Sequence, residues 1–160
     1  MQERNIQTAF RLYESPTELE DADARLLAHA RKALENSYSP YSQFKVGAAI
    51  LLANGEIMGG ANYENAAYPL CICAEQSVLS AAASRFPGVA IEAIAVAVHS
   101  EHQVVSQPAA PCGACRQVIC ETEHKFGRPM RVLLQGETGP VVRFEKGGDL
   151  LPLAFDASYL

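Results

Sequence analysis

The chain is organised around two short stretches, Cys71-Ile72-Cys73-Ala74-Glu75 and Pro111-Cys112-Gly113-Ala114-Cys115. Two residues separate Cys112 from Cys115, a spacing at which both thiolates can reach one Zn²⁺, and an upstream cysteine supplies a third ligand. Three protein ligands leave one coordination position for water, as in catalytic rather than structural zinc sites. On a helix, residues two apart do not share a face. We therefore expect Glu75 to be an acid or base beside the metal and not a ligand with Cys73.

Two other metal sites are compatible with the sequence. Cys71 could join the three cysteines in a closed four-thiolate site, which would be structural and would hold no water. His99-Ser100-Glu101 also precedes the second stretch with His-x-Glu spacing. Only about ten residues separate it from Cys112, which leaves no room for the helix and strand that should intervene. Retention of zinc after replacement of Cys71 would separate the open site from the closed one.

The two stretches resemble the signature of the zinc nucleoside and nucleobase deaminases, which is His-x-Glu or Cys-x-Glu followed by Pro-Cys-x-x-Cys. The resemblance is to the small homotetrameric cytidine deaminases and extends from about residue 17 to residue 155. It is carried by five segments: Tyr38–Ala49, Asn62–Tyr68, Cys73–Glu75, Pro111–Gln117 and Leu150–Phe155.

The resemblance implies a zinc-dependent hydrolytic deamination of cytidine and deoxycytidine in pyrimidine salvage. Cys73, Cys112 and Cys115 would hold the ion. Glu75 would take a proton from a water activated by zinc and then deliver protons to N3 of the base and to the departing ammonia. One carboxylate would thus serve both as base and as acid.

The resemblance also assigns the substrate contacts. Asn62 and Glu64 would bind the ribose hydroxyls, and an amide paired with a carboxylate is a reasonable clamp for a diol. Phe44 would lie against the base. The backbone N–H of Ala74 is a candidate donor to the 2-carbonyl.

Two further aromatic residues complete the implied site from outside the subunit. Phe155 would also lie against the base, and both Phe155 and Tyr68 would come from neighbouring subunits of a homotetramer. Phe44 and Phe155 could instead belong to a hydrophobic core, and Asn62 and Glu64 could simply satisfy a turn.

Two positions depart from the family pattern. Gln76 stands where members with three cysteine ligands commonly have Arg, which donates to the thiolates. Three thiolates carry one negative charge more than Zn²⁺ neutralises, so we expect the N-termini of the two following helices and Arg116 to offset it. Leu153 replaces the Gly of the Leu-Pro-Gly-x-Phe segment, which bears on the placement of Phe155.

Two other functions remain open from the residues. The scaffold could deaminate a different small aminopyrimidine or nucleoside analogue, because pocket shape and not zinc chemistry selects the base. Alternatively, Gln76 could mark a zinc-stabilised binding module that has lost activity.

Composition limits the partners and the location. About half of the 160 residues are apolar (49%), which suits one globular domain, and no apolar run approaches the length of a membrane span. The net charge is −5, and Lys and Arg are scattered singly, which favours a free nucleoside over nucleic acid. The N-terminus lacks the apolar region of a secretory signal, and five cysteines is an odd count. We expect a cytoplasmic protein with reduced thiols.

Periodicity and turn signals predict an α/β fold. Residues 1–16 are interpreted as an N-terminal extension and residues 17–160 as the deaminase-like domain. We expect helices near residues 17–36, 73–85 and 112–127, and strands near residues 46–53, 56–62, 89–98, 130–135 and 141–144. The order αββαβαββ predicts a three-layer α/β/α sandwich around a five-stranded mixed sheet. Asn54-Gly55 predicts a tight hairpin between the first two strands.

Overall fold

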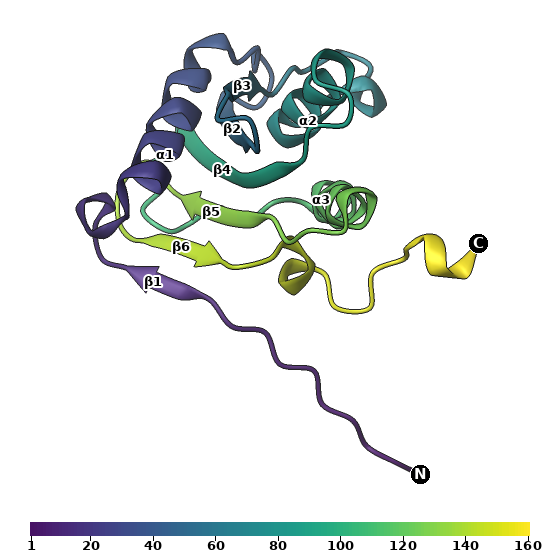
Figure 1. Ribbon diagram of the computed structural model, residues 1–160. Helices are drawn as coiled ribbons and strands as arrows, with labels where there is room; N and C mark the ends of the chain where they lie inside the picture. The colour runs from purple at the N-terminus through teal and green to yellow at the C-terminus, as the bar shows by residue number, and fades with distance from the viewer.

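A single mixed sheet of six strands forms the centre of the structure, a computed structural model that describes residues 1–160 (Figure 1). The spatial order is β1-β6-β5-β4-β2-β3. The strands are β1 (Arg11–Tyr13), β2 (Phe44–Leu52), β3 (Ile57–Ala61), β4 (Ile91–Ser100), β5 (Arg131–Gln135) and β6 (Val141–Phe144). Only β4 and β5 run parallel, and every other neighbouring pair is antiparallel.

Helices cover both faces of the sheet. Helix α1 (Asp21–Ala33) lies on one face, and α2 (Ala74–Arg85) and α3 (Gly113–Phe126) lie on the other (Figure 1). Successive residues of β4 point to opposite faces, so Ile94 packs under α2 and α3 whereas Ala95 packs under α1. The predicted α/β class and the three layers are therefore confirmed.

The centre of the sheet follows the sequence signals. The Asn54-Gly55 turn joins β2 and β3 as an antiparallel hairpin, and Gly55 adopts the positive φ of 86° that such a turn requires. The apolar run of residues 89–98 becomes the long central strand β4, which pairs with β2 on one side and β5 on the other. The short link between β5 and β6 makes that pair antiparallel, as predicted.

The predicted number of strands, five, is wrong. Residues 11–13 lie in the range interpreted as an extension, yet they form β1, which pairs antiparallel with the edge strand β6. The ring of Phe10, which precedes β1, lies 5.7 Å from the ring of Phe144 on β6. The strand is only three residues long and leaves Leu12 54% exposed, so its sequence shows little hydrophobic pattern. The remaining boundary at residue 16 stays a prediction.

Two helices begin directly after a cysteine. Cys73 is the N-cap of α2 and Cys112 is the N-cap of α3, in agreement with the predicted starts. Helix α3 ends at Gly127, which adopts a left-handed conformation with φ of 60°. None of the three helices has the length and apolar character needed to cross a bilayer.

The position of α2 depends on a close approach to β3. A Cβ atom at Gly60 would lie 2.8 Å from the Cβ and 2.9 Å from the backbone N of Val78 on α2. The neighbouring Gly59 points to the opposite face, where an added Cβ would be 3.4 Å from the Ala33 Cβ. Glycine at position 60 therefore lets the helix that carries Cys73 and Glu75 at its start lie directly on the sheet.

This packing predicts different outcomes for two adjacent substitutions. Gly60→Ala should destabilise the protein by roughly 1–3 kcal/mol, because the backbone of α2 must move to admit the methyl group. Gly59→Ala is the matched control and should change stability by less than about 0.5 kcal/mol. Thermal unfolding of both variants checks this, and equal stabilities would contradict the described packing of α2 on β3.

Candidate active site

Three cysteine thiols meet where α2 and α3 begin. The Sγ atoms of Cys73, Cys112 and Cys115 all lie within 4.8 Å of one another. The Sγ of Cys112 is 3.9 Å from that of Cys73 and 3.5 Å from that of Cys115. Cys115 is buried on the first turn of α3, whereas Cys112 is exposed. The three residues proposed from the sequence as ligands are thus brought together by the fold.

The geometry of the thiols fits a tetrahedral zinc ion. Two sulfur ligands at about 2.3 Å from one Zn²⁺ are about 3.8 Å apart when the site is tetrahedral. The Sγ separations of 3.5 Å (Cys112 to Cys115) and 3.9 Å (Cys112 to Cys73) bracket that value. Because only three sulfurs share the cluster, a bound ion would keep one coordination position for a ligand from solvent.

The two alternative metal sites are not formed. Cys71 lies outside the thiol cluster, and its Sγ accepts a hydrogen bond from the backbone N–H of Asn65 at 3.3 Å. The Nδ1 of His99 faces Glu137 at 3.1 Å, and this pair also lies outside the cluster. The closed four-thiolate site and the His-x-Glu site are therefore excluded as the metal centre.

Cys73 and Cys115 shift each other's pKa in opposite directions. A hydrogen bond from the Cys115 thiol lowers the pKa of Cys73 to about 6, against the opposing effects of burial and of Glu75. The same hydrogen bond raises the pKa of Cys115, because Cys115 is its donor, and burial adds to this effect. One thiol therefore ionises readily, and a bound cation would displace the remaining protons.

Glu75 lies in the first turn of α2 and is almost fully buried, with 4% of its surface exposed. Burial raises the pKa of its carboxyl group, against hydrogen bonds from its own backbone and from the Cys115 thiol. A buried carboxyl group with a raised pKa holds a proton more readily than an exposed one, so Glu75 is suited to accept a proton and then pass it on.

A cavity of about 340 Å³ opens onto the thiols. Its volume is within the range of small-molecule sites. The walls are mostly apolar, and the polar groups include Asn62, Glu64 and Glu75. The lining residues are Phe44, Val46, Asn62, Tyr63, Glu64, Cys71, Ile72, Cys73, Glu75, Val96, Val98, Ala109, Ala110 and Cys112. Ala74 is fully buried at the first position of α2, next to this cavity's Cys73 and Glu75, and its role stays a prediction.

The side-chain amide of Asn62 is engaged in three hydrogen bonds within the protein. Its Oδ1 accepts from the Ser37 hydroxyl at 2.6 Å and from the N–H of Val46 at 2.8 Å. Its Nδ2 donates to the carbonyl of Phe44 at 3.0 Å. One N–H of the amide remains for a ligand. The interpretation of Asn62 as a polar residue that satisfies local backbone is thus partly correct.

Glu64 is oriented by the loop that precedes β2. Its Oε2 accepts hydrogen bonds from the N–H groups of Tyr41 at 2.9 Å and Ser42 at 3.2 Å. A hydrogen bond from the Ser42 side chain, together with these two, holds the pKa of Glu64 below its usual value. These hydrogen bonds favour the ionised carboxylate and fix its orientation at the cavity, and its contact with a ribose hydroxyl stays a prediction.

Tyr68 and Phe155 do not line the cavity of their own chain. Tyr68 is 69% exposed and lies in a shallow depression beside Glu64, and Phe155 is 59% exposed on the C-terminal segment. Leu153 adopts a positive φ of 60°, which is the conformation that Gly favours. Leu153 thus keeps the left-handed backbone conformation that Gly would adopt freely. For a residue with a side chain this conformation costs roughly 1–2 kcal/mol relative to Gly.

Arg116, which was expected to offset the surplus charge of the thiolates, is engaged by backbone carbonyls instead. The guanidinium of Arg116 donates from Nε to the carbonyl of Pro111 at 2.9 Å and from Nη1 to that of Leu150 at 3.0 Å. None of its hydrogen bonds goes to a thiol. Arg116 therefore fixes the carbonyl directly before Cys112, while Gln76 lies at a groove between α2 and α3.

Comparison with known proteins places this site in a family. Residues 20–126 match the family described as the cytidine and deoxycytidylate deaminase zinc-binding region. The chain belongs to the cytidine deaminase family. The zinc predicted from the sequence is confirmed by this match together with the three-cysteine cluster.

Individual relatives in this family align over most of their length. The cytidine deaminase of Halalkalibacterium halodurans is 39% identical over 82% of this chain and 92% of the relative. The cytidine deaminase of Mycobacterium tuberculosis is 37% identical over 84% of this chain and 91% of the relative. The crystal structure of a cytidine deaminase from Burkholderia pseudomallei has a TM-score of 0.69 and 42% identity, over 82% of this chain and 97% of the other.

The structure adds contributors to the site that sequence reasoning missed. Ala109 and Ala110 form a wall of the cavity directly before the second cysteine stretch. The signal available was a pair of small residues between two prolines, Pro108 and Pro111, which indicates a fixed loop without a bulky side chain. Val96 and Val98 were predicted to belong to the central strand, but not to line a cavity.

The thiol cluster predicts which cysteines hold zinc in this deaminase. Cys112→Ser should lose most of its zinc, because an alcohol is a far poorer zinc ligand than a thiolate. Cys71→Ser is the matched control and should keep about one zinc per chain. Metal analysis of the purified proteins measures both. Loss of zinc from the Cys71 variant would restore the closed four-thiolate site as the correct description.

Proposed function

We propose that the chain is a zinc-dependent cytidine deaminase that hydrolyses cytidine and deoxycytidine to uridine and deoxyuridine in pyrimidine salvage. The observation that carries this proposal is the position of Glu75, buried beside three thiols that leave an ion one open coordination position. Family membership and the curated cytidine deaminases that resemble the chain support it. The ligands in this proposal are Cys73, Cys112 and Cys115.

The chain's own residues would carry the protons. Zinc, when bound, lowers the pKa of water and so supplies a nucleophile at neutral pH. Glu75 accepts the proton that water releases, and its raised pKa keeps that proton available. Glu75 then donates that proton to N3 of the base, which opens C4 to attack. Once the hydroxyl oxygen is bonded to C4, Glu75 takes the remaining hydroxyl proton and passes it to the amine. The C4–N bond then breaks, the C4 carbonyl forms and ammonia leaves. The carboxylate ends the cycle in its starting state.

The polar ends of the cavity would orient the nucleoside. Glu64 accepts a hydrogen bond from a ribose hydroxyl, and the remaining N–H of Asn62 donates to one. Phe44 and the apolar walls contact the base, and the N–H of Ala74 donates to its 2-carbonyl. In this arrangement Asn62 and Glu64 hold the sugar and Glu75 transfers the protons, and all three line one cavity.

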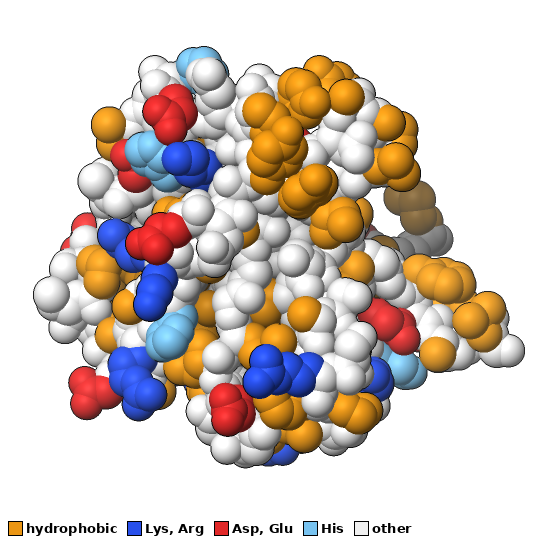
Figure 2. Space-filling view, turned by 90° about the horizontal axis from the view of Figure 1, so that it is seen from above, with side chains coloured by type: hydrophobic (Ala, Val, Ile, Leu, Met, Phe, Trp, Pro, Cys, Tyr) orange, Lys and Arg blue, Asp and Glu red, His pale blue; other side chains and the backbone are white.

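The charges around the cavity favour a nucleoside over a nucleotide. No Lys or Arg lines the cavity or the depression beside Glu64, so a phosphate there would meet carboxylates and no cation. On the face seen in Figure 2, Lys and Arg side chains are interspersed with Asp and Glu and form no continuous basic field. The net charge of −5 adds to this argument.

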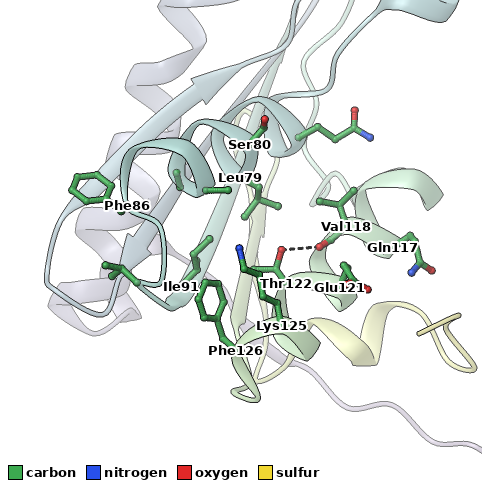
Figure 3. A pocket seen from close by; sticks show the side chains of 14 residues that line it. Leu79, Ser80, Phe86, Ile91, Gln117, Val118, Glu121, Thr122, Lys125 and Phe126 are labelled. Atoms are coloured by element: carbon green, nitrogen blue, oxygen red, sulfur yellow. Dashed lines mark hydrogen bonds between the residues drawn. The ribbon is translucent and has the colours of Figure 1, made fainter. Parts of the chain in front are cut away.

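A homotetramer with shared sites is part of the proposal. The largest cavity, about 550 Å³, lies between the outer faces of α2 and α3 and not at the thiols. Figure 3 shows Leu79, Phe86, Ile91 and Phe126 along this groove, where Thr122 donates to the carbonyl of Val118 at 2.8 Å. An exposed apolar groove of this kind is typical of a protein–protein interface. We assign it to a second copy of the chain, because Phe155 and Tyr68 remain outside their own cavity.

The cytoplasmic location predicted from the sequence also belongs to the proposal. All five cysteines are free thiols, and the three at the proposed metal site must stay reduced to bind an ion. A reducing compartment satisfies this requirement.

The proposed function is tested by the change in absorbance when cytidine is converted to uridine. The wild-type protein should deaminate cytidine and deoxycytidine and release ammonia, and should act poorly on cytidine monophosphate. Glu75→Gln, which keeps the shape but removes the proton acceptor, should lower kcat by roughly 10²- to 10⁴-fold. Glu92→Gln, on β4, is the control. A wild-type protein that binds zinc but leaves cytidine unchanged would point instead to a binding module.

Sharing of sites between subunits predicts complementation. Glu75→Gln and Phe155→Ala chains, assembled together, should form some sites with both native residues, namely Glu75 of one chain and Phe155 of another. In a random equal mixture, a site has native Glu75 with a probability of one half and receives native Phe155 from its neighbour with a probability of one half. About a quarter of the wild-type activity should therefore be restored, measured at cytidine concentrations below KM. Mixed assemblies no more active than the average of the two parents would contradict shared sites.

A further inference from the structure

The C-terminal segment after Leu151 forms an arm that projects from the body of the protein, at the right of Figures 1 and 2. Two contacts fix its course. The Nε2 of Gln117, on α3 two residues after Cys115, donates to the carbonyl of Phe155 at 2.7 Å. The side chain of Asp156 accepts a hydrogen bond from the N–H of Ser158 at 2.8 Å. The arm is therefore tied to α3, the helix that bears Cys115.

The end of the arm folds back on Phe155. A single turn of 3₁₀ helix, Ala157–Tyr159, begins after Asp156 and reverses the chain. The backbone N–H of Tyr159 donates to the carbonyl of Asp156 at 3.2 Å. As a result, the rings of Phe155 and Tyr159 stack with centroids 5.5 Å apart and an angle of 12° between their planes.

The stack is unusual in its exposure. Phe155 is 59% exposed and Tyr159 is 69% exposed, so the pair is not part of a hydrophobic core. Near-parallel aromatic pairs attract each other beyond their buried area, and a ring held by such a pair samples fewer orientations than a free one. Tyr159 covers one face of Phe155 and leaves much of its ring open.

We propose that Tyr159 is a positioning residue that stacks behind Phe155 and holds its ring in the orientation that receives the pyrimidine base. The inference rests on the proposed function, in which Phe155 contacts the base in a neighbouring subunit. Base, Phe155 and Tyr159 would then form one continuous stack. Because the ring is ordered before substrate arrives, binding does not have to immobilise it.

A positioning role predicts an effect on KM and not on kcat. Tyr159→Ala should raise KM for cytidine roughly three- to tenfold and leave kcat unchanged, since the lost contact stabilises bound substrate and transition state equally. Tyr159→Phe keeps the stacked ring and should keep KM within about twofold of wild type. Leu160→Ala, at the 97% exposed last residue of the same arm, is the matched control and should behave as wild type. Zinc content and assembled mass should be equal in all variants.

A double-mutant cycle separates this inference from the proposed role of Phe155. Tyr159 acts through Phe155, so Tyr159→Ala should raise KM no further in a Phe155→Ala background. An unchanged KM in Tyr159→Ala, or an equal rise in both backgrounds, overturns the inference even if Phe155→Ala itself raises KM. An unchanged KM in Phe155→Ala overturns instead the placement of Phe155 at the base.

Discussion

The structure depends on the convergence of two helix N-termini on one cluster of thiols. Cys73 and Cys112 cap α2 and α3, so each sulfur lies at the positive end of a helix and near backbone N–H groups without helical partners. Three thiolates with Zn²⁺ carry a surplus negative charge. Because Arg116 is engaged with backbone carbonyls, the two helix ends are the positive groups that lie at the sulfurs themselves. The close approach of α2 to β3 at Gly60 fixes where these ends meet.

Local signals predicted most of the fold. Asn54-Gly55 specified a hairpin, and the long apolar run specified the central strand, because both depend on neighbouring residues. The strand Arg11–Tyr13 could not be predicted in this way. Its partner β6 lies about 130 residues away, and the pairing uses backbone groups that every residue carries.

The site was predictable in its chemistry but not in its geometry. The Cys-x-x-Cys spacing identified Cys112 and Cys115 as a metal-binding pair, since a metal imposes that spacing on the sequence. The resemblance to the deaminase signature then assigned Cys73 and Glu75. The hydrogen bonds of Asn62 to Ser37 and Val46 join distant residues and leave no trace in local pattern. The same holds for the cavity walls, which exist only when strand and loop are packed together. The position of Phe155 outside the cavity of its own chain likewise becomes visible only in the folded structure.

The central claim is that three sulfurs hold zinc and that a fourth position is open to solvent. X-ray absorption at the zinc edge of the purified protein measures the ligands directly. The account predicts three sulfur ligands at about 2.3 Å and one lighter ligand at about 2.0–2.1 Å. A shell of four sulfurs would show a closed structural site and would contradict the assignment of hydrolytic chemistry to this cavity.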